Sequence, residues 1–321
     1  MRILITGSSG FIGYHLCEQL LKDENIFIIG LDNMNNYYDV NLKISRLHNL
    51  KLKKNFKFIK ADINNTNKLQ SIIKNYKINY VIHLAAQAGV RYSIKNPQTY
   101  FENNIQGFFN ILELARINNI KHLVYASTSS VYGSNSTFPL SEEFNTDKPL
   151  SFYAATKKSN EVMAYAYSNI YNIPITGLRF FTVYGPYGRP DMSLFMFASN
   201  IIKNKTISLF NNGEHTRDFT YIDDVVDGII KSLVNVPNTK VPYSIYNIGN
   251  GKPRSLKKFL SIIEKKLNKK AIIKKKPLQQ GDVIKTHADI NKISKKLNYN
   301  PKTSIEVGIE KFIGWILKNK S

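Results

Sequence analysis

The chain has 321 residues, 43% hydrophobic and 12% aromatic, which is enough to bury one large core or two coupled lobes and excludes a disordered chain. No run of about 18 apolar residues marks a membrane span, and Met1 leads straight into the apolar pattern Ile3-Leu4-Ile5 rather than a secretory signal. The single cysteine, Cys17, cannot form an internal disulfide. We expect a cytoplasmic protein that does not enter the membrane.

The formal charge of +22 raises the question of a nucleic-acid partner. The lysines are dispersed along the chain, as at Lys51, Lys203, Lys265 and Lys274, and neither a zinc-ligand cluster nor an aromatic ribonucleoprotein motif accompanies them. We therefore expect no nucleic-acid partner and no metal site. A basic surface still attracts a small anionic substrate, with an affinity that falls as salt rises.

Short apolar runs alternate with helical patterns through the first half of the chain, which is typical of a parallel sheet covered on both faces. Strands are predicted at residues 3–6, 27–31, 56–59, 80–83, 123–126 and 175–179. Helices are predicted at 12–21 and 69–75, with two longer ones at 97–118 and 152–170. This pattern predicts an α/β fold with a Rossmann-type doubly wound parallel sheet.

The pattern changes after Phe180, where Tyr184-Gly185-Pro186-Tyr187-Gly188-Arg189-Pro190 is rich in loop signals. A helix at 225–233 and a strand at 244–248 are expected to rejoin the sheet, whereas helices at 256–267 and 305–317 are expected in a smaller C-terminal, substrate-binding lobe. We expect a Rossmann domain from residues 1–180 and 223–250, and the lobe from residues 181–222 and 251–321.

A glycine motif, Gly7-Ser8-Ser9-Gly10-Phe11-Ile12-Gly13, follows the first predicted strand and opens the first helix. Glycines permit a tight turn, a close approach of backbone to a pyrophosphate, and close packing of helix on strand. The helix N-terminus adds free N–H groups and a partial positive charge. We therefore expect Gly7, Gly10, Phe11, Ile12 and Gly13 to contact a dinucleotide.

Asp32 ends the second predicted strand and lies 19 positions after Gly13, a spacing typical of a carboxylate that binds the adenosine ribose hydroxyls. Asn33 follows it, and Asn33-Met34-Asn35 offers no adjacent cation for a 2′-phosphate. The motif therefore favours NAD over NADP. The alternative is that Asp32 only caps a turn.

Tyr153-Ala154-Ala155-Thr156-Lys157 places a tyrosine and a lysine four residues apart, on one face of a helix. A free tyrosine with a pKa near ~10 is a poor base at neutral pH. A nearby ammonium and a cationic nicotinamide both favour the phenolate. The alternative is that Tyr153 and Lys157 are two ordinary surface side chains. A catalytic pair is favoured because it comes after both the glycine motif and the segment Ser127-Thr128-Ser129-Ser130-Val131-Tyr132-Gly133.

With these motifs the sequence resembles the extended short-chain dehydrogenase/reductases, and among them the NAD-dependent nucleotide-sugar epimerase/dehydratase family. The resemblance covers essentially the whole chain, through the strings that begin at Arg217 and at Gln279-Gln280-Gly281. Other strings are similar to those of bacterial family members that convert UDP-glucuronate to UDP-galacturonate. They are Leu31-Asp32-Asn33 with Tyr37-Tyr38-Asp39, the run from His83 to Tyr92, and Phe181-Thr182-Val183-Tyr184-Gly185-Pro186 with Gly188-Arg189-Pro190-Asp191-Met192.

The resemblance implies roles for the matched residues. Tyr153 would be the base and acid at O4 of the sugar, Lys157 would hold the nicotinamide ribose, and Thr128 would hydrogen-bond O4. The cofactor residues would also include Asp62 and Ile63 at the adenine and Ala85 and Ala86 beside the phosphates. The substrate residues would be Arg217 at the diphosphate, Asp282 at the nucleotide ribose with Gln279 nearby, and Arg91 and Arg189 as further cations. Each residue could instead make only local structural contacts.

The residues after Thr128 separate the reactions that begin with oxidation at C4. Family dehydratases commonly carry an Asp-Glu pair there, and decarboxylases commonly carry a Glu, whereas this chain has Ser129 and Ser130. The resemblance therefore implies epimerisation through a transient 4-keto sugar, with NAD regenerated in each turnover. A decarboxylase is a less favoured alternative. A non-catalytic NAD-binding protein is disfavoured because Tyr153, Lys157 and Thr128 are all present.

Oxidation of a glucuronate at C4 gives a β-keto acid, which loses CO₂ when the carboxylate bond aligns with the carbonyl. Hydroxyl donors suit the task of fixing the carboxylate, and Ser129, Ser130 and Thr182 are the candidates. Thr286, where neutral-hexose epimerases often have a tyrosine, indicates a roomier pocket. That pocket would also admit an N-acetyl group, so UDP-N-acetylglucosamine or its uronate is the alternative substrate. The helices at 97–118 and 152–170 resemble the pair through which family members form homodimers.

Overall fold

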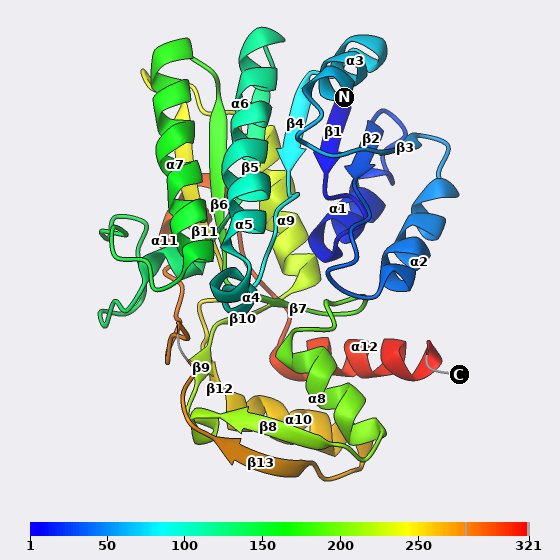
Figure 1. Ribbon diagram of the computed structural model, residues 1–321, viewed down its shortest axis with the longest axis vertical. Coiled ribbons are helices and arrows are strands. Elements are labelled where there is room, and N and C mark those ends of the chain that lie inside the picture. Colours follow the sequence, from blue (N-terminus) through cyan, green and yellow to red (C-terminus); the bar gives the residue numbers. More distant parts are fainter. Residues whose placement is uncertain (280, 320–321) are drawn as a thin grey trace.

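A parallel sheet of seven strands forms the upper part of the protein (Figure 1). The computed structural model describes residues 1–279 and 281–319. The sheet has the strand order β11-β6-β5-β4-β1-β2-β3. Its strands are β1 (Arg2–Thr6), β2 (Phe27–Asp32), β3 (Phe56–Lys60), β4 (Tyr80–His83), β5 (His122–Thr128), β6 (Ile175–Phe180) and β11 (Tyr243–Ile248). The predicted strands and the doubly wound fold class are confirmed.

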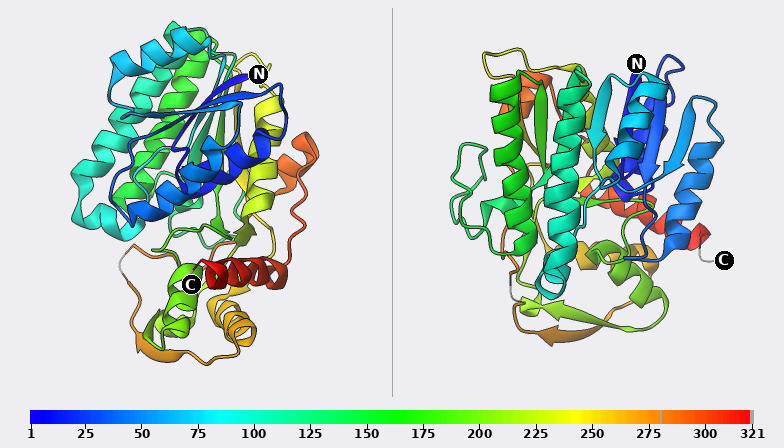
Figure 2. Two further views of the ribbon diagram at one scale, coloured as in Figure 1. Left: turned by 90° about the vertical axis from the view of Figure 1, so that its right-hand side faces the viewer. Right: turned by 45° about the horizontal axis from the view of Figure 1, so that its top comes forward.

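Helices cover both faces of this sheet (Figure 2), because alternate residues of each buried strand point to opposite sides. Ile3 and Ile5 of β1 face one hydrophobic core and Leu4 faces the other. The first core is covered by α1 (Phe11–Leu20), α2 (Val40–Lys51) and α9 (Ile222–Val234). The second is covered by α3 (Thr66–Tyr76), α6 (Gly107–Ile117) and α7 (Phe152–Tyr171).

The predicted helix at 97–118 contains a π-helical turn. It consists of α5 (Pro97–Tyr100), the π-helix η1 (Phe101–Gln106) and then α6. π-turns occur mostly as local bulges and frequently lie at functional sites. In this one the Asn104 side chain donates hydrogen bonds to the Gln87 carbonyl at 3.0 Å and to the Thr156 hydroxyl at 3.0 Å. The turn therefore joins the segment after β4 to α7.

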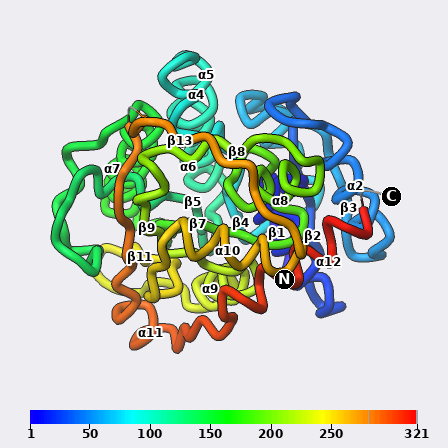
Figure 3. The backbone as a smooth tube through the Cα atoms, turned by 90° about the horizontal axis from the view of Figure 1, so that it is seen from below, coloured from blue at the N-terminus to red at the C-terminus, as the bar shows by residue number. Residues whose placement is uncertain are grey.

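The C-terminal lobe lies below the carboxyl edge of the sheet (Figure 1). From below, β8 and β13 run side by side, as their parallel pairing requires (Figure 3). The lobe and the segments that join it to the sheet contain β7 (Thr182–Tyr184), α8 (Ser193–Ile202), β8 (Thr206–Phe210), β9 (Thr216–Arg217), β10 (Phe219–Tyr221), β12 (Arg254–Ser255), α10 (Leu256–Leu267), β13 (Ile272–Lys276), α11 (Asn291–Leu297) and α12 (Ile305–Lys318). One hydrophobic core runs from Ile3 and Ile5 of the sheet to Phe259 and Phe312 of the lobe, so the two parts pack intimately.

Within the described ranges 1–279 and 281–319, no helix has the length and apolar character needed to cross a membrane. The same residues bring no three His, Cys, Asp or Glu side chains together in a way that would hold a metal ion.

Candidate active site

A cavity of about 820 Å³ lies between the carboxyl edge of the sheet and the lobe. In a doubly wound sheet, ligands bind outside the carboxyl ends of the strands, where the strand order reverses, and here β1 pairs with both β2 and β4. The described lining includes every predicted site residue except Asp62 and Gln279. Gln280, part of a predicted string, lies outside the described residues.

The structure treats the two exceptions differently. Asp62 accepts a hydrogen bond from the side chain of Asn33 at 2.9 Å, and Asn33 does line the cavity. The Gln279 side-chain oxygen is buried with no hydrogen-bond partner among the described residues. The structure therefore brings Asp62 to the cofactor residues through Asn33 and shows no contact of Gln279 with the cavity.

The glycine loop has the geometry that a bound dinucleotide needs. Gly7 has a positive φ of 74°, and its N–H donates to the Leu31 carbonyl at 2.7 Å. A Cβ atom on Gly13 would lie 2.2 Å from the Gly7 carbonyl oxygen, so only glycine permits this approach of helix α1 to the loop. The hydroxyls of Ser8 and Ser9 are buried without hydrogen-bond partners among the described residues, and neither residue lines the cavity. Gly7, Gly10 and Gly13 do line it, and the free N–H groups at the N-terminus of α1 suit the phosphates of a dinucleotide.

Asp32 lines the cavity and also holds the local turn, so its turn contacts are observed and its binding of the ribose stays a prediction. It is 6% exposed, and its carboxylate accepts hydrogen bonds from the backbone N–H of Ser9 at 3.1 Å and of Met34 at 2.8 Å. The segment after Asp32 carries no cation, as the sequence shows, but the Lys43 ammonium lies 3.9 Å from the Asp32 Oδ1 atom. Lys43 comes from α2, eleven residues away along the chain, which local sequence spacing does not reveal.

Tyr153 lies in the first turn of α7, and Lys157 follows one turn later. Ser151 caps this helix by accepting the N–H of Ala154 at 3.2 Å. Burial raises the pKa of Tyr153, while the Thr128 hydroxyl and the Arg189 guanidinium act to lower it. Burial lowers the pKa of Lys157 to about 8. A further positive charge beside the phenol is therefore needed to ionise it near neutral pH.

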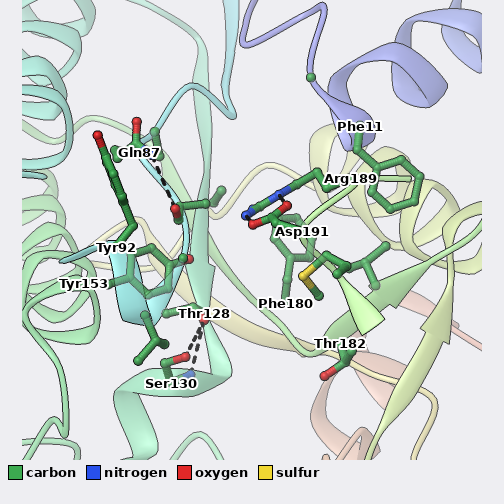
Figure 4. Close-up of a pocket in the computed structure, with 18 of the residues that line it drawn as sticks. Phe11, Gln87, Tyr92, Thr128, Ser130, Tyr153, Phe180, Thr182, Arg189 and Asp191 are labelled. Atoms are coloured by element: carbon green, nitrogen blue, oxygen red, sulfur yellow. Dashed lines mark hydrogen bonds and ion pairs between the residues drawn. The ribbon is translucent and has the colours of Figure 1, made fainter. Parts of the chain in front are cut away.

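Thr128 ends β5 and begins the short turn η2 (Ser129–Tyr132). Its hydroxyl accepts the N–H of Ser130 at 3.2 Å and donates to the Ser130 hydroxyl, also at 3.2 Å. Figure 4 shows Tyr153 beside Thr128 and Ser130, on one side of the cavity. Ser129 and Ser130 both line the cavity, so hydroxyls rather than carboxylates follow Thr128 at the site.

The opposite wall carries Arg189, Asp191 and Thr182 (Figure 4). The Arg189 guanidinium donates to both carboxylate oxygens of Asp191, at 3.0 and 2.5 Å. The Tyr37 hydroxyl donates to the same carboxylate at 3.2 Å. Arg189 is thus a positive charge held in place at the Tyr153 end of the cavity, with its geometry fixed by Asp191.

A cluster of charges lies around Asp282 at the lobe side of the cavity. Side-chain nitrogens of Arg91, Arg217 and His215 lie 3.6, 3.7 and 3.9 Å from its carboxylate oxygens. The Nε2 atom of His215 is buried and has no hydrogen-bond partner within residues 1–279 and 281–319. Three nitrogen donor groups around one carboxylate suit a ligand that carries both a diphosphate and hydroxyls. Thr286 also lines the cavity, and its hydroxyl accepts the N–H of Asp218 at 3.1 Å.

Sequence reasoning gave no role to several residues that the structure places at this site. They are Tyr37, Lys43, Asp191 and His215, which line the cavity, and Asn104, which lies outside the lining and joins Gln87 to Thr156. Tyr37 and Asp191 lie within sequence segments that resemble the family, and His215 is two residues before Arg217. These three residues could therefore have been predicted from the sequence. Lys43 reaches the cavity from α2 and Asn104 lies within η1, and no local motif indicates either residue.

Comparisons with known proteins agree with this geometry. A family model described as GDP-mannose 4,6 dehydratase matches residues 4–312. The chain is 46% identical over 98% of its length to a UDP-glucuronate 4-epimerase of Thermodesulfobacterium geofontis, covering 96% of that protein. It is 47% identical to Protein CapI of Staphylococcus aureus, over 99% of both chains. It is also similar to the crystal structure of UDP-glucuronic acid 4-epimerase from Bacillus cereus in complex with UDP-glucuronic acid and NAD, with a TM-score of 0.94 and 37% identity over 99% of this chain and 100% of that one. The chain belongs to the NAD-dependent nucleotide-sugar epimerase/dehydratase family.

Proposed function

We propose that the protein catalyses the NAD-dependent epimerisation of UDP-glucuronate at C4, giving UDP-galacturonate. One observation carries the proposal: Tyr153, Lys157 and Thr128 meet at the cavity beside Ser129 and Ser130, with no carboxylate directly after Thr128. This site can remove and return the proton at O4, but it lacks the adjacent acid that elimination of water requires. The relatives that carry the same activity in their names support the choice.

The residues of the cofactor end fit NAD. Gly7, Gly10 and Gly13 with the N-terminus of α1 would hold the pyrophosphate, and Asp32 would bind the adenosine ribose. Phe11, Ile12, Asn33, Asp62 and Ile63 would complete the adenosine side, and Ala85 and Ala86 would lie beside the phosphates. NAD supplies, when bound, reversible hydride acceptance at C4 of the sugar and a positive charge near the phenol.

Tyr153 moves the proton at O4. Its phenolate takes the proton from the 4-hydroxyl as C4 is oxidised, and returns it to O4 after the 4-keto sugar has turned over. Thr128 donates a hydrogen bond to O4 in both orientations of the ring. Lys157, with its ammonium fixed at the end of β5, binds the nicotinamide ribose and favours the ionised form of Tyr153.

The 4-keto intermediate of a glucuronate is a β-keto acid. If the C5–C6 bond aligns with the carbonyl, that bond breaks, CO₂ leaves, and the electron pair forms a C4–C5 enolate that takes up a proton at C5. Ser129 and Ser130 line the cavity beside the catalytic groups, and Thr182 lines the opposite wall. The three hydroxyls are proposed to hold the carboxylate out of that alignment. If these hydroxyls no longer fix the carboxylate, CO₂ is lost and the product is a pentose.

The uridine diphosphate is proposed to occupy the charged cluster of the lobe. Arg217 and Arg91 would bind the diphosphate, Asp282 would bind the ribose hydroxyls, and Arg189 would supply a further positive charge near the sugar. Gln279 stays a candidate for the nucleotide. This assignment divides the chain into an NAD-binding domain, residues 1–180 with 223–250, and a nucleotide-sugar lobe, residues 181–222 and 251–321.

The protein is proposed to be a cytoplasmic homodimer. Large apolar side chains are exposed along α6 and α7, with Phe109 at 44%, Val162 at 57%, Tyr165 at 52% and Ile170 at 66%. These two helices lie next to each other on the outside of the sheet (Figure 1). Exposed apolar residues gathered on adjacent helices mark an interaction surface, and a second copy of the same chain presents a matching one.

The choice of substrate is tested by comparing kcat/KM for UDP-glucuronate and for UDP-N-acetylglucosamine, in the wild-type protein and in Ser129→Ala and Thr182→Val. The proposal expects the acid sugar to be preferred by the wild type. Both variants should lose part of that preference and release some pentose product. Thr286 lines the cavity without filling it as a tyrosine would, so a wild type that prefers the N-acetylated sugar would favour the second candidate substrate.

A further inference from the structure

A buried ion pair lies directly behind the catalytic groups. Glu161 on α7 and Arg179 on β6 are 5% and 4% exposed at their side chains, and the carboxylate accepts two hydrogen bonds from the guanidinium, at 2.9 and 2.8 Å. Glu161 lies four residues after Lys157 and eight after Tyr153, on the same face of the helix. Neither side chain lines the active-site cavity as the structure describes it, so the proposed reaction leaves the pair without a role.

The Glu161–Arg179 pair contacts both ends of the turn that contains Thr128. On the near side, the Ser127 hydroxyl donates to the Glu161 carboxylate at 2.6 Å, one residue before Thr128. On the far side, the Arg179 guanidinium donates to the Tyr132 hydroxyl at 3.0 Å and lies 4.8 Å above its ring. Tyr132 is the last residue of η2, so the segment from Thr128 to Val131 lies between two anchored residues.

The far anchor is itself fixed to the sheet. The Tyr132 hydroxyl donates to the side-chain oxygen of Asn247, on β11, at 2.6 Å. The Asn247 backbone N–H donates to the Glu142 carboxylate at 2.8 Å. A continuous chain of buried hydrogen bonds therefore runs from α7 through β6 and η2 to β11, with few degrees of freedom left for the turn.

We infer that the Glu161–Arg179 pair positions the Thr128–Ser130 turn, and that it thereby sets both the rate of epimerisation and the fraction of intermediate lost to decarboxylation. The inference rests on the proposed function, because Ser129 and Ser130 are the groups proposed to hold the sugar carboxylate. Glu161 and Arg179 are positioning residues and touch neither substrate nor cofactor.

A buried ion pair is a poor way to stabilise a fold, because desolvation of the two charges offsets most of their attraction, and a well-packed apolar pair is often at least as stable. Its advantage is geometric, since a planar guanidinium and a carboxylate fix each other's orientation while each bonds a third group. Here the third groups are Ser127 and Tyr132, the two residues that bound the turn. The Glu161 charge also acts on Lys157, whose pKa it raises against the lowering effect of burial.

The test uses the double variant Glu161→Met/Arg179→Met, which removes both charges together, so that neither member of the pair is left without its partner. Arg179→Lys is the second variant, since it keeps the charge but not the planar, two-pronged bonding. The matched control is Asp227→Asn, which removes the 2.8 Å ion pair to Lys231 on the surface of α9. All proteins are prepared with bound NAD and assayed with UDP-glucuronate by proton NMR, which separates the hexuronate and pentose products.

We expect the double variant to unfold at nearly the wild-type temperature and keep its NAD, while kcat falls by about 10- to 100-fold and KM changes by less than about threefold. The pentose fraction rises in the same variant, Arg179→Lys lies between it and the wild type, and the control matches the wild type. Unchanged kcat and product ratio would overturn the inference. So would a loss of activity that only accompanies loss of folding or of NAD.

A readout that needs no turnover separates this inference from the proposed function. Hydrogen exchange of the NAD-bound proteins reports the backbone amides from Ser129 to Tyr132 directly. Faster exchange of these amides in the double variant, with α9 unchanged, supports the pair as an anchor even if the wild type acts on another sugar. Equal exchange in the two proteins overturns it. If the wild type does not epimerise UDP-glucuronate, that result contradicts the proposed function but not the role of the pair in positioning the turn.

Discussion

The Lys157 ammonium donates a hydrogen bond of 2.9 Å to the backbone carbonyl of Ala126, two residues before Thr128. This bond joins the helix that carries the proposed base to the strand that carries its hydrogen-bonding partner. Because Lys157 is only 2% exposed, its position is set by the strand and not by solvent. The hydrogen bond thus holds α7, which carries Tyr153, at a fixed distance from β5, which carries Thr128.

Replacing Tyr153 by Phe should remove the group that takes the O4 proton. We expect kcat to fall by about 10²- to 10⁴-fold, the range for loss of a general base, while bound NAD is retained because the helix and Lys157 stay in place. Steady-state NMR assays measure the first effect, and absorbance of NAD released on denaturation measures the second. Tyr171→Phe, at an exposed tyrosine of the same helix, is the control and should match the wild type. A Tyr153→Phe enzyme with near wild-type kcat would exclude Tyr153 as the base.

Asp32 and Lys43 together should set the choice between NAD and NADP. In the wild type the Asp32 carboxylate lines the cavity and lies 3.9 Å from the Lys43 ammonium, which it neutralises. If Asp32 binds the ribose as proposed, we expect NAD to bind at least about 100-fold more tightly than NADP. In Asp32→Asn the ammonium loses its counter-charge and can attract a 2′-phosphate, and the preference should fall by at least about tenfold. Titration of cofactor-stripped protein with both dinucleotides measures this. The double variant Asp32→Asn/Lys43→Met should not gain affinity for NADP. If it gains as much affinity as Asp32→Asn alone, the Lys43 ammonium does not attract the 2′-phosphate.

Much of this site was predictable from sequence because its parts are carried by local motifs. The glycine loop, Asp32 and the Tyr153–Lys157 pair each lie at a fixed spacing within one strand, loop or helix, and the structure brings them to one cavity. The strands of the main sheet were predictable for a similar reason, since buried parallel strands are short, continuous apolar runs. The family and fold predictions are confirmed, and the predicted activity and cofactor agree with the relatives.

What sequence did not reveal depends on contacts between distant segments. Lys43 reaches Asp32 from α2, and Arg179 meets Glu161 across two elements of the second half of the Rossmann fold. Helix α2 escaped prediction because its polar and apolar residues are mixed, with Lys43 and Arg46 among the buried positions. The short pairing of β8 with β13 joins residues that are 66 positions apart, which no local period indicates.

Two buried histidines should make the fold less stable below neutral pH. Burial lowers the pKa of His83 to about 3 and that of His122 to about 4. Below the unfolded value near 6.5 the unfolded chain binds protons that the folded chain does not, so stability present above that pH is lost as pH falls toward the folded values. From pH 7 to 5.5 the two groups together should cost about 2.5 kcal/mol of unfolding free energy.

Urea unfolding at the two pH values measures this loss. His122 bonds the Leu233 carbonyl at 3.0 Å and the Thr176 hydroxyl at 2.9 Å, so His122→Gln can keep one of these bonds while it removes the titration. The variant should be less stable at pH 7, and its loss between pH 7 and 5.5 should be smaller than that of the wild type by about 1.2 kcal/mol. A variant with the full wild-type loss between pH 7 and 5.5 would mean that other groups cause it.

The proposed dimer predicts a specific effect of charge on α7. Val162 is 57% exposed on that helix, and Val162→Asp would place a carboxylate in the interface, where no partner is available to compensate its desolvation. Light scattering should give twice the chain mass of 36.8 kDa for the wild type and the single mass for the variant. Val236→Asp, at an exposed valine after α9, is the control and should stay dimeric. A wild type that is monomeric at micromolar concentration contradicts the dimer.

The central claim is tested most directly by incubating the purified protein with UDP-glucuronate, without added NAD, and following the sugar by one-dimensional proton NMR. The proposed mechanism predicts that UDP-galacturonate appears and approaches an equilibrium mixture, with no accumulation of NADH, because the cofactor stays bound and is regenerated in each turnover. No conversion, repeated with NAD added, would contradict the proposed substrate. Conversion to a pentose as the main product would contradict the proposal that Ser129, Ser130 and Thr182 protect the carboxylate.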